Sequence, residues 1–216
     1  MLRLIRREPS ALLFLSQLAA VLAYPFLEGS GAGRAVFSAL GILFLGLVVL
    51  AVRSTPALLW IAVLLGIPAT LLLIIQAVTG SDTLFPYSSA LEAVLYFYAA
   101  GALIMYMLAD HEVTRDELFA IGATFTLVAW AFAYTFVFVQ EVAPGSFIAA
   151  VHPEAARTWM ELLFLSFTTL TSTGLSDVVP VEPFARSVVM IEQLAGLGYV
   201  AMIVSRLVGL TVMKRV

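Results

Sequence analysis

The sequence predicts an all-α membrane protein with six transmembrane helices and one shorter helix between the fifth and the sixth. Two observations carry this prediction. Hydrophobic residues make up 62% of the 216 residues and charged residues only 12%, about half of the charged share with which a soluble domain covers its surface. In addition, six apolar runs approach the length of about 20 residues that a helix needs to cross the hydrocarbon core. We therefore expect a multi-pass protein of a cell (plasma or inner) membrane, surrounded by lipid.

Turn-forming and charged segments separate the six runs. Residues 28–34 are rich in glycine, and Arg53-Ser-Thr-Pro56 has the composition of a tight turn. The most charged stretch, Asp110 to Glu117, precedes the fifth run, and within it Thr114 and Glu117 have the spacing of a capping box. The expected spans are Ala11–Leu27, Ala35–Val52, Ala57–Val78, Ala90–Leu108, Leu118–Val139 and Phe184–Leu210.

The composition also argues against several classes of protein. The chain has no cysteine, so no disulfide or thiolate metal site is available, and we expect no transition-metal site and no organic cofactor. It has no basic run of the kind that binds nucleic acid. A secondary transporter would carry two similar halves with broken helices, whereas the sequence contains a single broken element.

An enzyme is not expected either. Gly174-Leu-Ser176 is faintly similar to the motif of intramembrane serine proteases, which need a serine in G-x-S-G and a histidine on a spanning helix. Residue 177 is Asp, and both His111 and His152 lie between apolar runs. The residues for that chemistry are therefore missing.

The placement of basic residues predicts that both termini are cytoplasmic, with an even number of crossings. The cytoplasmic side would then carry Arg3, Arg6, Arg7, Arg53, Arg115, Lys214 and Arg215, against Arg34, Arg157 and Arg186 outside. The outer side would also collect Glu28, Asp82, Glu141, Glu154, Asp177 and Glu182. Two interpretations of this acidic side stay open: it concentrates cations at an outer mouth, or acidic loops simply translocate easily.

The segment from Gln140 to Pro183 does not form a full span. We expect a loop as far as His152, a helix start at Pro153-Glu154 and a helix over Ala155–Thr168, which is too short to cross. The following stretch, Thr168–Asp177, has hydroxyl groups on six of its ten residues. Irregular backbone at membrane depth is tolerated only where it is buried in protein or lines a wet cavity. The sequence therefore predicts a re-entrant pore helix followed by a pore loop.

This stretch resembles the filter signature of potassium channels, T-V-G-Y-G followed by Asp. Thr171 precedes the filter in that register, and the filter positions are taken by Ser172, Thr173, Gly174, Leu175, Ser176 and Asp177. Downstream, Pro180-Val181, Arg186 and Ala195-Gly196 fall where the family has a proline, an arginine and the hinge glycine of its inner helix. The resemblance covers roughly residues 118–210. It implies a pore domain over 111–216, built from an outer helix, a pore helix, the filter and an inner helix.

The resemblance also implies a partner and an ion. Four chains complete the filter ring, so a homotetramer is expected. The permeant ion would be K⁺ or Na⁺, bound as a monovalent cation by filter carbonyls. Residues 1–110 resemble a voltage-sensor domain in the number and position of their helices, but Ala90–Leu108 contains no arginine or lysine. Since a voltage sensor moves such charges through the field, we expect no voltage gating.

The filter departs from the family pattern at its outer end. Gly174 keeps the first of the two glycine positions of the family pattern, which need left-handed backbone. Ser176 replaces the second glycine, and left-handed backbone at a non-glycine residue costs about 1–2 kcal/mol. Leu175 replaces the tyrosine and cannot bond to the pore helix, and Phe164-Leu165 replaces a tryptophan pair of many family pore helices. We therefore expect weakened or altered potassium selectivity, with the inner sites around Thr171, Ser172 and Thr173 still able to hold a cation.

Polar residues of the last span leave two interpretations open. Glu192, Gly196, Tyr199, Ile203 and Arg206 share one helical face. This face either lines the pore or gate, or it turns away from the ions, with Glu192 and Gln193 bonded to the pore helix. Gly196 and Gly198 are candidates for a gating hinge, and glycines there would equally permit close packing. For Glu161, in the short helix, we expect a buried carboxylate bonded to the backbone of the filter.

Together these observations predict a tetrameric, potassium-channel-like channel for monovalent cations that is not gated by voltage. The alternative is a channel-shaped protein that does not conduct and serves as a membrane scaffold or a regulatory subunit. Ion conduction separates the two.

Overall fold

The computed structural model describes residues 8–27, 31–53, 55, 57–80, 82–109 and 114–213. The chain divides into two compact units, Met1–Val128 and Ala129–Val216. The division falls inside helix α6 (Arg115–Val142). The functional division expected at residue 110 concerns which residues form a pore, and it stays a prediction.

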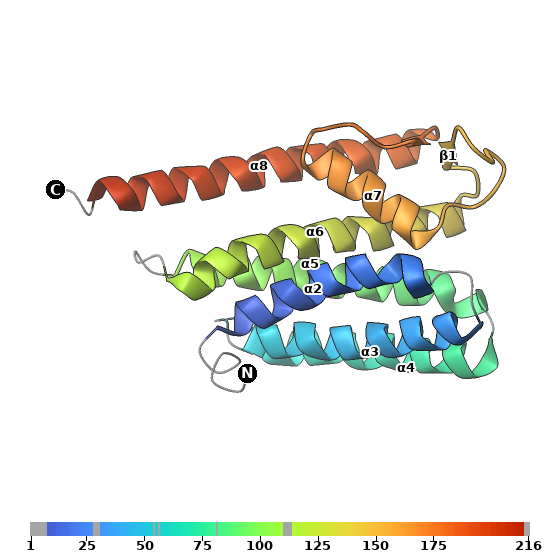
Figure 1. Cartoon of the computed structure of the whole chain (residues 1–216), viewed down its shortest axis with the longest axis horizontal. Helices are drawn as coiled ribbons and strands as arrows, with labels where there is room; N and C mark the ends of the chain where they lie inside the picture. Colours follow the sequence, from blue (N-terminus) through green and yellow to red (C-terminus); the bar gives the residue numbers. More distant parts are fainter. Residues whose placement is uncertain are drawn as a thin grey trace. The chain divides into compact units, whose positions relative to one another are not determined.

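The first unit is a bundle of long helices (Figure 1). In chain order it contains α2 (Pro9–Leu27), α3 (Gly31–Arg53), α4 (Leu59–Thr79), the short 3₁₀ helix η1 (Asp82–Leu84), α5 (Phe85–Met107) and the first half of α6. Helix α3 packs against α2, α4 and α5, and α4 also packs against α5. The core is built largely from alanine and leucine side chains, such as Ala62, Leu95 and Ala99, which are fully buried.

Two helix ends in this unit have clear local causes. Helix α4 ends at Gly80, which has a φ of 64° and whose N–H donates to the carbonyl of Gln76 over 2.9 Å. Helix α5 begins at Phe85, with Pro86 in its first turn, which is earlier than the expected start at Ala90. Glu92 therefore lies inside the helix, and it is buried.

A polar cluster joins the start of α6 to the start of α2. The carboxylate of Asp116 accepts hydrogen bonds from the N–H and the hydroxyl of Ser10, at 3.0 and 2.9 Å. It also accepts one from the hydroxyl of Tyr106, at 3.1 Å. One of the two bonds of the expected capping box of α6 is present, because the N–H of Glu117 donates to the hydroxyl of Thr114 over 3.2 Å. Asp116 thus satisfies a first-turn N–H of α2 that has no partner within its own helix.

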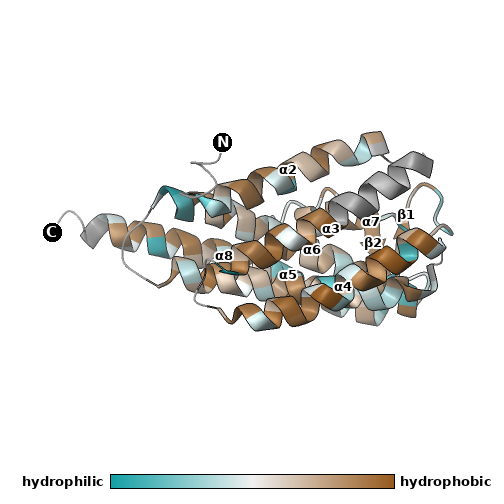
Figure 2. Cartoon of the chain, turned by 90° about the horizontal axis from the view of Figure 1, so that it is seen from below, coloured by the Kyte–Doolittle hydropathy of each residue, from teal (hydrophilic) through white to brown (hydrophobic). Residues whose placement is uncertain are grey.

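Among the described residues, five helices are long and apolar enough to cross a membrane. They are Pro9–Phe26, Leu59–Thr79, Phe85–Met107, Arg115–Val142 and Pro183–Thr211. The remaining expected span, Ala35–Val52, lies within α3, a helix of 23 residues. Figure 2 shows α4 and α8 as hydrophobic along most of their length. The chain is a multi-pass membrane protein.

Five of the seven basic residues that predict a cytoplasmic side lie outside the described part of the chain. These are Arg3, Arg6, Arg7, Lys214 and Arg215, and Glu28 and His111 lie outside it as well. The cytoplasmic location of both termini therefore stays a prediction.

The second unit contains short elements between two long helices. After α6 come the strand β1 (Phe147–Ala149), helix α7 (Trp159–Leu170), the strand β2 (Val178–Pro180) and helix α8 (Pro183–Met213). The two strands pair antiparallel, with Ile148 opposite Val179. This small sheet was not expected from the sequence. It joins the segment that leaves α6 to the segment that enters α8, and α7 packs against α8 (Figure 1).

Candidate functional site

Helix α7 begins at Trp159, not at Pro153-Glu154 as the sequence suggested. Thr158 is its N-cap: its hydroxyl accepts from the N–H of Glu161 over 3.3 Å, and the carboxylate of Glu161 accepts from the N–H of Thr158 over 2.6 Å. These reciprocal bonds form a complete capping box. The expected bond between Glu161 and the filter backbone is wrong, because this carboxylate lies at the opposite end of the helix.

Arg157 organises the loop in front of α7. Its buried guanidinium donates to the carbonyls of His152 and Ala155, the first over 2.6 Å and the second through Nε over 3.1 Å, and it lies 3.4 Å from the carboxylate of Glu161. The backbone of Arg157 is held from α6. Gln140 accepts from the N–H of Arg157 over 2.7 Å and donates to its carbonyl over 3.1 Å. One charged side chain and one amide therefore fix the entry of the chain into α7.

Aromatic side chains hold the first turn of α7 against α6. The ring of Trp159 lies 5.2 Å from that of Trp130 in an edge-to-face arrangement and 5.8 Å from that of Tyr134. Such pairs contribute about 0.5–1.5 kcal/mol beyond the area that they bury. Phe164, where the family often has a tryptophan, is 47% exposed. The aromatic anchor of this helix is thus at its start rather than beside the filter.

The C-terminal end of α7 forms a Schellman motif with a serine at its left-handed position. Ser172 has a φ of 57°, and its N–H donates to the carbonyl of Thr169 over 3.0 Å. The N–H of Thr173 donates to the carbonyl of Thr168, also over 3.0 Å. These are the two bonds that define the motif, whose left-handed residue is usually glycine.

The carbonyl of Thr168 is the centre of this turn. It accepts from the N–H of Gly174 over 3.2 Å as well as from that of Thr173. The hydroxyl of Thr171 donates to the carbonyl of Phe167 over 2.7 Å and lies 3.0 Å from the hydroxyl of Thr173. The loop therefore begins by folding back onto the end of α7.

The expectation of backbone strain at Ser176 is wrong. Within the described residues, the non-glycine residues with positive φ are His152 and Ser172, and Ser176 is not one of them. Its hydroxyl instead accepts from the N–H of Val178 over 3.1 Å, directly before β2. Gly174 has the left-handed backbone expected for it, with a φ of 65°. The left-handed non-glycine residue lies at the start of the loop, directly after α7, because the Schellman motif requires it there.

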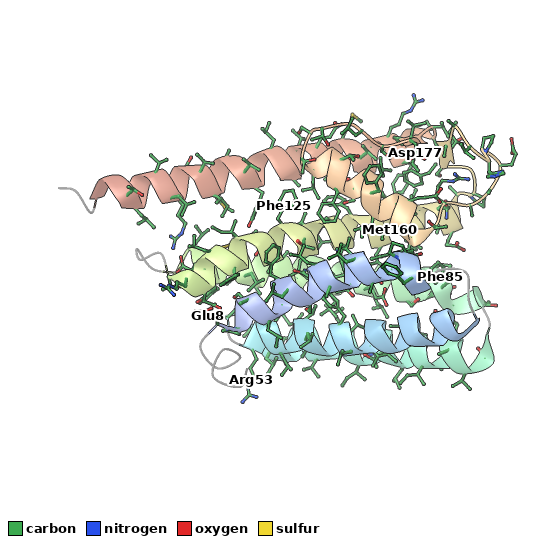
Figure 3. All side chains as sticks on the ribbon, in the orientation of Figure 1. Glu8, Arg53, Phe85, Phe125, Met160 and Asp177 are labelled. Atoms are coloured by element: carbon green, nitrogen blue, oxygen red, sulfur yellow. The ribbon has the colours of Figure 1, made fainter. Side chains whose placement is uncertain are left out.

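The predicted filter residues form one continuous stretch that is largely exposed in the single chain. Thr171, Ser172, Thr173, Gly174 and Asp177 are exposed, and Leu175 is 77% exposed. In Figure 3, Met160 marks the first turn of α7 and Asp177 the loop that follows this helix. The stretch combines backbone carbonyls with the hydroxyls of four residues, and such neutral oxygens can replace the hydration shell of a monovalent cation.

Glu192 and Gly196 face α7. Glu192 is fully buried and hydrogen-bonded to the hydroxyl of Ser166, which lies 2.8 Å from the carbonyl of Ala129 in α6. A Cβ added at Gly196 would lie 2.9 Å from the Cα of Leu170, and closer still to its carbonyl oxygen. Tyr199 and Ile203, which share a helical face with Glu192, are also buried in the single chain. Of the two expected bonds to the pore helix, that of Glu192 is present; Gln193 is exposed and has no such bond within the described residues.

The model of a family described as "Ion channel" matches residues 93–212, more than half of the chain. The comparisons with curated proteins and with solved structures give no match.

The chain belongs to the potassium-channel-like family of ion channels. This confirms the resemblance that the filter stretch suggested. The matched region begins inside α5 and contains α7, the filter stretch and nearly all of α8, so every residue of the candidate site lies within it.

Several residues that shape this part of the channel were not expected from the sequence. Arg157, Gln140 and Ser166 were not recognised, and the start of α7 was misplaced. The signal for the helix start was available, because Thr158 and Glu161 have the same spacing as Thr114 and Glu117. No local pattern pointed to Gln140, since its partner is 17 positions away.

Proposed function

We propose that the chain forms a homotetrameric, potassium-channel-like channel for monovalent cations, with a filter at Thr171–Asp177, weakened or altered potassium selectivity and no voltage gating. In this proposal α6 is the outer helix, α7 a re-entrant pore helix and α8 the inner helix. The permeant ion is K⁺ or Na⁺, held by filter carbonyls. The six helices α2 to α6 and α8 span a cell membrane with both termini in the cytoplasm.

The observation that carries the proposal is the arrangement of α7 between α6 and α8. Ser166 of α7 contacts Glu192 of α8, and Leu170, four residues later in α7, contacts Gly196, four residues later in α8. The two helices therefore run in the same direction. A helix of 12 residues is about 18 Å long, too short for about 30 Å of hydrocarbon. The chain then returns through the filter stretch to β2, beside β1. A half-crossing followed by an irregular return is what a re-entrant pore loop requires.

The exposure of the filter stretch supports assembly from several copies. Polar backbone at membrane depth must be covered by protein or lie against water, and four copies around an axis provide both. Large apolar side chains of α8 are also exposed in the single chain, among them Ile191, Leu194 and Leu197. Neighbouring copies and lipid would cover them.

The absence of voltage gating is supported by α5. This helix, Phe85–Met107, is the fourth of the chain's long helices and carries no arginine or lysine. Each charge that moves through the field contributes about 2.3 kcal/mol per 100 mV. A helix without such charges has nothing to move, so we expect the open probability not to depend on voltage through α5.

Ion flux through purified protein in liposomes tests the proposal. Native protein is compared for K⁺, Na⁺ and a large organic cation with a Leu175→Tyr/Ser176→Gly double variant, and native mass spectrometry counts the copies. We expect four copies, flux of the small cations, and a sharper preference for K⁺ in the double variant. Four copies without flux in either form would instead favour a non-conducting scaffold, and a different number of copies would overturn the filter ring.

A further inference from the structure

A buried hydrogen-bond network connects three helices of the second unit. The hydroxyl of Ser166 lies within hydrogen-bonding distance of the carbonyl of Ala129 in α6, 2.8 Å away, and of the carboxyl group of Glu192 in α8. Ser166 and Glu192 are fully buried. The second carboxyl oxygen of Glu192 has no hydrogen-bond partner among the described residues. A carboxylate with so little compensation is costly in an apolar interior.

The hydroxyl of Ser166 cannot donate to both of its neighbours. The hydroxyl of Ser166 carries one proton, and the carbonyl of Ala129 can only accept. If Ser166 donates to Ala129, the bond between Ser166 and Glu192 needs a proton from the carboxyl group. In this arrangement Glu192 is a neutral carboxylic acid that donates to Ser166. The hydroxyl of Ser166 in turn donates to the carbonyl of Ala129 in α6.

A second contact lies one helical turn further along the same two helices. The backbone of Leu170, the last residue of α7, packs directly against Gly196 of α8. Any other residue at position 196 would collide with this backbone. No such contact exists at Gly198, where an added Cβ meets nothing within 4 Å in the described chain. The outer part of α8 is therefore fixed to α7 at two points, and its first unrestrained glycine follows directly after them.

We propose that Glu192 is a positioning residue for the filter: as a neutral acid it donates to Ser166 and clamps the inner helix to the pore helix. The end of α7, where the loop folds back on the carbonyl of Thr168, is then held by α8 rather than by a cuff of pore-helix aromatic residues. A bend of α8 that accompanies gating would begin beyond Gly196, at Gly198. This inference rests on the proposed channel function.

Infrared spectroscopy combined with ion flux tests the clamp. The native protein in liposomes is expected to show the carbonyl stretching band of a protonated carboxylic acid, shifted on deuteration and missing from Glu192→Gln. The amide of this variant still donates to Ser166, so its flux should stay within about twofold of the native value. Glu192→Leu and Ser166→Ala each remove the bond and should lower flux about tenfold, the size expected for one buried hydrogen bond.

The double variant Glu192→Leu/Ser166→Ala distinguishes a clamp from two separate roles. Two residues that act through one bond should give the double variant the flux of either single variant. The proposal would be overturned if the flux losses of the two single variants multiplied in the double variant. It would also be overturned by native flux in Glu192→Leu, or by a Glu192→Gln variant as impaired as Glu192→Leu. Absence of the acid band would overturn it as well. Since the band requires no conduction, its absence is distinct from failure of the channel proposal itself.

Discussion

The two units of the chain are stabilised by different kinds of interaction. In residues 8–128, regular helices pack through small apolar side chains, and a polar side chain such as Gln17 reaches a single carbonyl, that of Ala123 at 3.3 Å. In residues 129–213, single polar side chains hold irregular backbone. Gln140 satisfies both the N–H and the carbonyl of Arg157. Loss of the Gln17 side chain should therefore cost less than loss of the Gln140 side chain.

The largest difference is expected between two buried glutamines. Gln140→Leu leaves two buried backbone groups of Arg157 without their partner, at about 1–3 kcal/mol each, so we expect it to lower the free energy of unfolding by about 3 kcal/mol. Gln17→Leu is the matched control. Within the described residues the carbonyl oxygen of Gln17 has no partner, so its loss should change stability by less than about 1 kcal/mol. Unfolding in mixed micelles measures both values, and equal losses would contradict the comparison.

Two glycines provide the next comparison. Gly196→Ala places a methyl group against the backbone of Leu170, which cannot move without displacing α7, so we expect a loss of about 2–3 kcal/mol. Gly122→Ala meets the ring of Phe14 at 2.8 Å. Because a ring can turn away, this change should cost about 1 kcal/mol or less.

The same unfolding measurement applies to this pair. A Gly196→Ala protein as stable as the native one would show that α7 and α8 do not approach as closely as described. Gly198→Ala serves as a second control within α8. It meets no atom within 4 Å and should leave the protein as stable or slightly more stable, because alanine favours helix over glycine by up to about 1 kcal/mol.

The smallest expected effect concerns the two serines of the filter stretch. Ser172 has left-handed backbone, so Ser172→Gly should stabilise the protein by about 1 kcal/mol. Ser176 does not have a positive φ, so Ser176→Gly should bring no such gain and should cost about 0.5–1 kcal/mol through added chain entropy. Thermal unfolding of the two variants side by side decides the sign. The opposite order would restore the expectation from sequence, that the strain lies at Ser176.

The long helices could be predicted from sequence because hydrophobic length is a local property. The apolar runs lie within the observed helices, apart from small shifts at their ends, since Pro86 and Thr114 act within a few residues of themselves. The irregular segment after α7 was harder to predict from the sequence. The left-handed backbone of Ser172 depends on bonds to Thr168 and Thr169 that exist only once α7 has ended.

The surroundings of Glu192 could be predicted in part. The helical face that it shares with Gly196 follows from spacing alone, but whether this face meets the pore or the pore helix depends on packing across 26 positions of sequence. For the same reason the sequence left hinge and close packing open at Gly196. The backbone of Leu170 decides for close packing there, and the hinge role of Gly198 stays a prediction.

The most direct test of the central claim, that ions pass along residues 171–177, uses the absence of cysteine from the chain. Leu175→Cys and Asp177→Cys each introduce a single thiol in the exposed filter stretch, and Val151→Cys introduces one at an exposed position of the loop before α7. A positively charged thiol reagent is applied during K⁺ current recordings in planar bilayers, with mass spectrometry to verify complete labelling. We predict that labelling at 175 or 177 abolishes the current while labelling at 151 leaves it unchanged. Full current through completely labelled Leu175→Cys and Asp177→Cys proteins would contradict the account.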